Sequence, residues 1–203
     1  MAAHRGREGT VSVIDEAIVA LRMGKLVVVP TDTVYGLAAP LEDDSIAKIF
    51  ELKGRPSEKP LPVLGASLPD LEDIADFNDQ ARKLAARFWP GPLTMILQRA
   101  PSFDVDLGGT NVTTVGVRVP KEPRAIELLK RTGPLAVTSA NLSGSTEATT
   151  VEEARAALGT RDVFYVDGGR CTGKPSTIVF LAAERRILRE GAISDEDIFR
   201  TMQ

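Results

Sequence analysis

Residues 26–30 of the chain read LVVVP, a run that is apolar at every position and ends in a proline. β-Branched side chains favour strands, and a continuous apolar run is typical of a strand buried inside a sheet. The proline ends the strand because it cannot donate a backbone hydrogen bond to a neighbour. A second run of this kind, LAVTS at 135–139, also leads directly into small polar residues. Both stretches predict central strands of a sheet.

Helical and strand patterns alternate outward from these two runs. Ile14, Ala17, Ile18 and Leu21 recur at helical spacing, and Gly24 ends that helix. Further helices are expected from Asp44 to Gly54 and over 68–76, 78–88, 124–131, 151–158 and 195–201. Further strands are expected over 61–65, 93–98, 113–119, 163–166, 177–181 and 186–189. This interleaving predicts one α/β domain over residues 1–203, an open mixed sheet with flanking helices and a flexible end over residues 1–10.

The composition excludes several classes of protein. The chain has 203 residues, 43% of them hydrophobic, and a net charge of −3, so overall charge does not predict nucleic-acid binding. With one cysteine, Cys171, and one histidine, His4, neither an intrachain disulfide nor a zinc site of the usual ligands is expected. Asp15 and Glu16 interrupt the first apolar stretch, and no run approaches the length of a membrane span. A cytoplasmic protein without membrane contact is expected.

Two segments rich in Gly, Ser, Thr and Asp, 99–112 and 142–150, have no predicted helix or strand. They are either binding loops or flexible connections. A near match to a phosphate-binding loop runs from Gly168 to Lys174, but Pro175 stands where that motif needs Ser or Thr, and a strand pattern follows instead of a helix. We therefore interpret it as a glycine-rich turn.

Polar side chains cluster where the first buried strand ends. Thr31, Asp32, Thr33 and Tyr35 follow it directly. Ligands of open α/β sheets bind outside the carboxyl ends of strands, so these groups are candidates for binding an amino acid or a ribose. The alternative is a turn in which the side chains bind their own backbone.

A basic segment, KGRPSEKPL at 53–61, follows a predicted helix. Lys53, Arg55 and Lys59 lie between prolines that restrict their movement, and clustered, oriented cations suit a phosphate. A solvated basic loop is the alternative.

Three further groups of polar or cationic residues accompany predicted strands. Arg118 interrupts the apolar pattern of TVGVRVP at 114–120 and shares one strand face with Thr114. Arg189 follows the apolar pattern of the strand at 186–189. The run LAVTSANLSG at 135–144 supplies Thr138, Ser139, Asn141 and Ser143. These groups could instead face water or cap a helix, but together they suit a concave site for an anionic ligand.

Seven of these stretches, in this order, make the chain resemble the YrdC-like family of threonylcarbamoyl-adenylate synthases in its single-domain form. They are PTDTVYGL, KGRPSEKPL, WPGPLT, VGVRVP, TSANLSG, STIV and ILREG, and the resemblance runs from about residue 14 to residue 193. It implies a twisted open α/β sheet around a large, positively charged cavity. It also implies a nucleotidyltransferase that makes threonylcarbamoyl-AMP and pyrophosphate from L-threonine, bicarbonate and ATP.

The resemblance also implies roles for individual residues. The family's K-x-R signature falls on Lys53 and Arg55, the catalytic candidates, and its S-x-N signature falls on Ser139 and Asn141. The nucleotide would be held by Arg55, Lys59, Thr114, Ser139, Asn141, Thr149 and Arg189. Threonine would be held by Thr33, Arg118 and Ser139. Magnesium would arrive on the ATP phosphates rather than on a protein metal site.

The implied partners are a threonylcarbamoyl transferase complex, which would pass the group to tRNA, and weakly bound tRNA itself. Two positions depart from the family pattern: Lys59 replaces an Asn, and Leu64 replaces a His that contacts threonine in many members. Two other functions remain open. One is a non-catalytic RNA-binding module, which the net charge and the 5% aromatic content disfavour. The other is a carbamoyl-transferring maturation module, for which the expected zinc-binding cysteines are missing.

Overall fold

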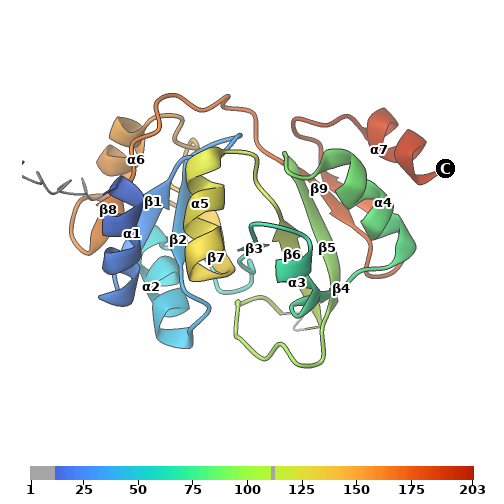
Figure 1. Cartoon of the computed structure of the whole chain (residues 1–203), viewed down its shortest axis with the longest axis horizontal. Helices are drawn as coiled ribbons and strands as arrows, with labels where there is room; N and C mark the ends of the chain where they lie inside the picture. The colour runs from blue at the N-terminus through green and yellow to red at the C-terminus, as the bar shows by residue number, and fades with distance from the viewer. Residues whose placement is uncertain (1–11, 111–112) are drawn as a thin grey trace, which may run out of the picture.

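A mixed β-sheet forms the centre of the computed structural model, which describes residues 12–110 and 113–203 (Figure 1). Within these residues the strand order is β10-β9-β5-β6-β3-β7-β2-β1-β8, with β4 paired to β5. The strands are β1 (Leu26–Val29), β2 (Gly36–Ala39), β3 (Val63–Leu64), β4 (Ala75–Asp76), β5 (Leu93–Arg99), β6 (Thr114–Arg118), β7 (Leu135–Ser139), β8 (Val163–Tyr165), β9 (Thr177–Phe180) and β10 (Arg186–Arg189). The expected flexible end over residues 1–10 lies outside the described residues.

The sheet consists of two halves joined through the two-residue strand β3. One half contains β8, β1, β2 and β7, and the other contains β6, β5, β9 and β10; Figure 1 shows them on either side of β3. Val63 is opposite Val117 of β6, in parallel, and Ala136 of β7, in antiparallel orientation. The pairs β1–β8 and β5–β9 are also parallel, so the sheet is mixed as expected.

Helices cover both faces of the sheet. They are α1 (Val13–Arg22), α2 (Asp43–Lys53), α3 (Pro69–Glu72), α4 (Asp79–Phe88), α5 (Pro123–Thr132), α6 (Val151–Leu158) and α7 (Asp195–Met202). Alternate residues of β1 point to opposite faces. Val27 and Val29 pack with α1 and α5, whereas Leu26 and Val28 join the larger cluster that includes α2 and α6. The continuous apolar run in the sequence therefore reflects a strand buried on both sides.

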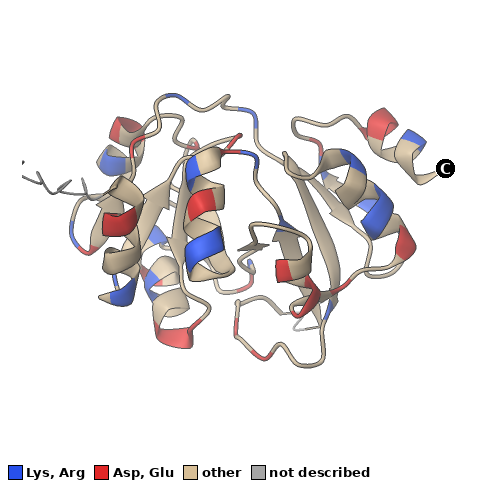
Figure 2. Cartoon of the chain, viewed as in Figure 1, with Lys and Arg blue, Asp and Glu red and all other residues tan. Residues whose placement is uncertain are grey.

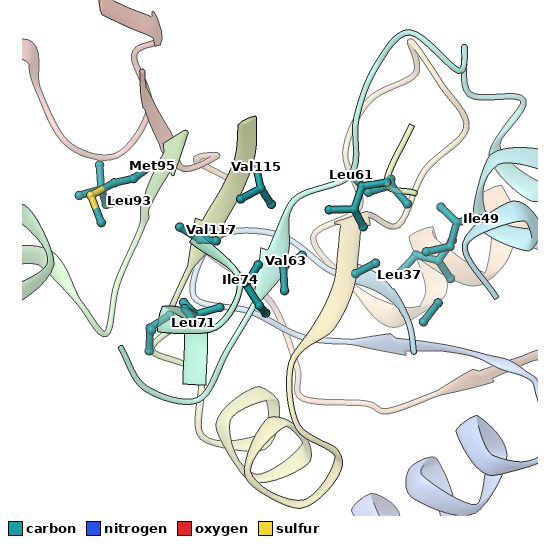
Figure 3. Close-up of a cluster of buried hydrophobic side chains, with 14 of the residues drawn as sticks. Leu37, Ile49, Leu61, Val63, Leu71, Ile74, Leu93, Met95, Val115 and Val117 are labelled. Atoms are coloured by element: carbon teal, nitrogen blue, oxygen red, sulfur yellow. The ribbon is translucent and has the colours of Figure 1, made fainter. Parts of the chain in front are cut away.

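The larger hydrophobic cluster extends through both halves of the sheet. Figure 3 shows Val63 of β3 between Leu37 and Ile49 on one side and Leu93 and Met95 on the other. These five side chains are almost completely buried. The core is thus continuous beneath the place where the two halves meet.

Two details of the sequence-based assignment of helices are wrong. The predicted helix 68–76 is the single turn α3 followed by β4, because Ala75 and Asp76 pair with β5. Asp44 does not begin α2: the helix starts at Asp43, and Glu42 precedes it without a side-chain capping hydrogen bond. Acidic residues in this first turn still interact favourably with the helix dipole.

Strand β2 was not expected, because its sequence, GLAA, has little β propensity. It forms because it pairs with β1 on one side and β7 on the other. A Cβ atom at Gly36 would lie 2.7 Å from Val137 Cγ1, so the close approach of β2 and β7 requires glycine.

The position of β2 inside the sheet can be tested with Leu37→Ala. Leu37 has no exposed surface, and we expect a loss of about 2–5 kcal/mol in the free energy of unfolding, measured by urea denaturation. The matched control is Leu188→Ala, because Leu188 is 53% exposed and should change stability by less than about 0.5 kcal/mol. Equal losses in the two variants would contradict the burial of β2.

Candidate functional site

A cavity of about 280 Å³ lies over β3, where the two halves of the sheet separate. Its walls come from both halves and from the loop before β3. The first half supplies Thr31, Thr33, Val34, Tyr35, Gly36, Val137, Thr138, Ser139 and Glu147. The second half supplies Thr94, Ile96, Thr114, Gly116, Arg118, Pro175, Ser176, Ile178 and Arg189. Arg55, Pro60, Leu61, Pro62 and Leu64 complete the lining.

Arg118, at the end of β6, is the most buried cation of the cavity wall. It is 6% exposed, and its guanidinium donates to Gly91 O at 3.0 Å, Thr33 Oγ1 at 3.1 Å and Asp32 Oδ1 at 2.8 Å. Burial lowers the pKa of Arg118, and the charge of Asp32 raises it again. An arginine pKa is so high that the group keeps its charge, and these three partners fix its orientation before any ligand arrives.

The residues at 31–35 form part of the cavity wall and also a turn that binds its own backbone, which were the two alternatives given by the sequence. Thr33 lines the cavity, whereas Asp32 is outside the lining and accepts from Arg118 and from the backbone N–H of Lys121 at 2.8 Å. Thr31 Oγ1 donates to Val34 O at 2.7 Å, as expected for a turn that satisfies its own backbone. Asp32 therefore supports Arg118 instead of facing a ligand.

Lys53 lies beneath the cavity and not in its wall. It is 2% exposed, and its ammonium donates to Ser139 O, Asn141 O and Asn141 Oδ1. Burial, with the charge of Arg55 as a second cause, lowers the pKa of Lys53 to about 8, so the group is still mainly protonated at pH 7. The sequence predicted that the charge of Lys53 would act directly on the substrates. The geometry instead indicates that Lys53 holds the turn that carries Ser139.

Arg55 lines the cavity, and the chain after α2 curls around it. Its Nε donates to Lys59 O at 2.9 Å and its Nη2 donates to Pro60 O at 3.0 Å. Burial lowers the pKa of Arg55. Gly54, in the left-handed region at φ 55°, starts this turn. The side chain of Lys59 is exposed and is not part of the cavity wall.

Arg189 of β10 is held by a serine that the sequence analysis did not single out. Its Nε donates to Ser176 O at 3.1 Å and its Nη2 donates to Ser176 Oγ at 3.2 Å. Ser176 Oγ is also 2.9 Å from Thr94 Oγ1. Ser176 opens the STIV motif and Thr94 closes the WPGPLT motif, so both could have been found by asking which hydroxyl groups follow these loops.

The cavity contains most, but not all, of the predicted site residues. Thr33, Arg55, Thr114, Arg118, Ser139 and Arg189 line it, while Lys53, Lys59, Asn141 and Thr149 do not. Asn141 is buried against Lys53, and its Nδ2 donates to Ser145 O at 2.6 Å. Thr149 donates from its N and its Oγ1 to Glu153. Leu64 gives the cavity an apolar wall at the position where the family pattern has histidine.

The segment 166–176, which we call the strap, connects β8 to β9 and crosses from one half of the molecule to the other (Figure 1). Tyr35 Oη donates to Gly169 O at 2.7 Å and accepts from Gly168 N at 3.1 Å. Gly173 N donates to Thr33 O at 2.9 Å. Strand β9 follows the near match to a phosphate loop, and residues 166–176 are an irregular connection rather than the expected glycine-rich turn.

Among the described residues, no helix is long and apolar enough to cross a membrane. In the same part of the chain, His, Cys, Asp and Glu form no group of three that could hold a metal ion. Three oriented guanidinium groups, from Arg55, Arg118 and Arg189, are the cations among the lining residues described here. They define an α/β protein with a cationic cavity between two halves of its sheet, a site suited to small anionic molecules.

The chain belongs to the Sua5/YciO/YrdC family: the family model, described as "Telomere recombination", matches residues 19–191. A putative threonylcarbamoyl-AMP synthase of Mycobacterium tuberculosis is 43% identical over 189 residues, 91% of this chain and 87% of the relative. The threonylcarbamoyl-AMP synthase of Bacillus subtilis is 40% identical over 190 residues, but this chain spans 55% of its length.

Solved structures of the family have the same fold. Sua5 of P. abyssi complexed with L-threonine superposes with a TM-score of 0.87 and 36% identity, covering 95% of this chain and 58% of that one. YciO of E. coli superposes with a TM-score of 0.82 and 27% identity, covering 90% of each chain. These neighbours confirm the expected family and the open mixed sheet.

The supporting role of Lys53 can be tested with Lys53→Met. The substitution removes the ammonium from the carbonyl groups of Ser139 and Asn141, and Ser139 O keeps only the backbone N–H of Asn141, so we expect a loss of about 1–3 kcal/mol in the free energy of unfolding at pH 7. Lys59→Met is the matched control, because Lys59 is exposed and its removal should cost less than about 0.5 kcal/mol. Urea denaturation of both variants gives the comparison, and equal stabilities would contradict the role.

Proposed function

We propose that this protein is an L-threonylcarbamoyladenylate synthase, which converts L-threonine, bicarbonate and ATP into threonylcarbamoyl-AMP and pyrophosphate. The observation that carries the proposal is the single cavity in which Arg55, Arg118 and Arg189 are held in place by other parts of the chain. The names of the two relatives and the threonine complex of Sua5 support the same activity.

Threonine would lie between Thr33, Ser139 and Arg118, with its carboxylate on the guanidinium. The Arg118 guanidinium can bind the carboxylate of threonine in addition to that of Asp32, because it carries five N–H donors in a planar fork. The nucleotide would contact Arg55, Thr114 and Arg189, and its outer part would extend toward the exposed Lys59 and the half-buried Thr149, with Asn141 buried behind them. A cavity of about 280 Å³ is near the lower limit for small-molecule sites, about 300 Å³, so part of the triphosphate must lie outside it.

The reaction needs no nucleophile from the protein. The amine of threonine bonds to the carbon of bicarbonate and water leaves, which gives an N-carboxylate. An oxygen of that carboxylate then attacks the α-phosphorus of ATP, and pyrophosphate takes away the electrons of the broken P–O bond. Since ATP, the carboxylate of threonine and the N-carboxylate are all negatively charged, the contribution of the chain is to hold them close together against their repulsion.

Magnesium would reach the site on the phosphates of ATP, where it would neutralise part of their charge. Arg55 and Arg189 would hold the phosphate oxygens that the metal leaves free.

The product is a mixed anhydride, which transfers its threonylcarbamoyl group readily. A transferase complex that modifies tRNA is therefore the expected consumer. The cytoplasm is the expected compartment. The alternative RNA-binding function finds less support. A nucleic-acid-binding surface needs a patch of exposed positive charge that is not interrupted by acidic side chains. Here Arg118 is buried, and Lys and Arg alternate with Asp and Glu over the helices in the view of Figure 2.

The proposed function is tested by measuring pyrophosphate release from ATP in the presence of bicarbonate. Release that requires L-threonine is the expected result, with threonine omitted or replaced by alanine as controls. Binding of RNA with no release under any of these conditions would favour the alternative.

Arg55→Ala should lower the rate of pyrophosphate release at least about tenfold, equivalent to about 1.4 kcal/mol. The reason is the loss of an oriented charge from the cavity wall. Arg82→Ala is the matched control, because Arg82 is 52% exposed and pairs with Glu72 on the surface. An Arg55 variant as fast as this control would remove Arg55 from the mechanism.

A further inference from the structure

Glu147 places a carboxylate in the wall of the cavity. It belongs to the connection between β7 and α6, and its side chain is 29% exposed. Among the described residues that line the cavity, it is the only acidic one. Glu147 lies in the segment 142–150, which was expected to be either a binding loop or a flexible connection, and no role was predicted for this residue.

The contacts of Glu147 leave its carboxylate available to a ligand. Its Oε1 lies 3.8 Å from Arg189 Nη1, which is longer than a hydrogen bond, so the two groups attract each other without being locked together. Arg189 is instead held through its Nε and Nη2 by Ser176. Lys53, the other nearby cation, uses its ammonium on Ser139 and Asn141, although the charge of Glu147 raises its pKa.

The proposed substrates create a need for a carboxylate at this place. Threonine carries an ammonium group as well as a carboxylate, and the guanidinium groups of the cavity repel that ammonium. The amine must also lose a proton before its lone pair can attack carbon. Arginine cannot accept this proton, and the hydroxyl groups of threonine, serine and tyrosine are weak bases. Tyr35 Oη is in addition engaged with the strap.

We propose that Glu147 binds the amino group of the threonine substrate and accepts its proton. This inference rests on the proposed function and adds a residue to it. Arg118 holds the carboxylate of threonine and Glu147 holds the amine, so that one molecule spans the cavity. Both side chains line the same cavity, together with Arg189, whose Nη1 lies 3.8 Å from Glu147 Oε1 and whose charge helps to lower the pKa of Arg118.

The ammonium of threonine gives one proton to the Glu147 carboxylate and becomes a neutral amine. The amine forms its bond to the bicarbonate carbon and water leaves, which gives the N-carboxylate. Glu147, which is partly exposed, then returns its proton to solvent, so that one proton is released in each turnover.

Glu147→Gln tests the proposal, because it keeps the size of the side chain and removes its charge. The probes are L-threonine and 2,3-dihydroxybutanoate, which has a hydroxyl in place of the amine. Calorimetry should show that the wild-type protein prefers threonine by at least about tenfold, and that the variant loses most of this preference. Pyrophosphate release should slow to a similar extent in the variant, with the KM for ATP nearly unchanged. Glu147→Asp should recover part of both losses.

Glu184→Gln provides the matched control on an exposed turn, and thermal unfolding of each variant checks that it folds. The proposal is overturned if Glu147→Gln keeps the preference for threonine. It is also overturned if the only effect of Glu147→Gln is tighter binding of ATP, because Glu147 would then be a simple counter-ion of Arg189. A higher requirement for magnesium as the only effect would overturn it as well. Failure of the wild-type protein to bind threonine would overturn the proposed function itself. The wild-type measurement alone shows this, so the two failures can be told apart.

Discussion

The pairing of β3 with its two neighbours is the constraint on which the rest of the molecule depends. Only Val63 and Leu64 connect the two halves of the sheet by strand pairing within the described residues. Because this strand is so short, the halves separate beyond it, and the cavity occupies the space between them. Pro60 and Pro62 stiffen the chain that enters the strand and also form part of the wall. The same few residues therefore join the core and shape the site.

The structure also has to offset the free-energy cost of burying positive charge. A buried guanidinium is stable only when its donors are paired. The buried Arg118 uses a carboxylate, a hydroxyl and a carbonyl group, whereas the half-buried Arg55 and the more exposed Arg189 use backbone carbonyls and one serine. The partners of Arg118 belong to distant parts of the sequence, and those of Arg55 lie in the turn that follows it, so both charges are oriented by the fold. A ligand does not have to order them, and this lowers the entropic cost of binding anions.

The sequence was most informative where one local pattern determined the structure. The runs at 26–30 and 135–139 are buried strands, and the helix at 151–158 has the predicted limits. Strand β2 could not be predicted, because GLAA becomes a strand through its two neighbours. In the site, residue types at strand ends identified Arg118, Arg189 and Ser139. The burial of Lys53 and the position of Glu147 depend on how distant loops pack, which spacing along the chain does not reveal.

The strap sets a mechanical limit on the opening of the cavity. It is fastened to the first half by the backbone hydrogen bond from Gly173 to Thr33, and the first residue of β9, Thr177, already belongs to the second half. Four residue steps of fully extended chain reach about 14 Å. The strap therefore acts as a short tether: while that hydrogen bond holds, the length of the chain limits how far Thr33 and Thr177, and with them the two halves, can lie apart.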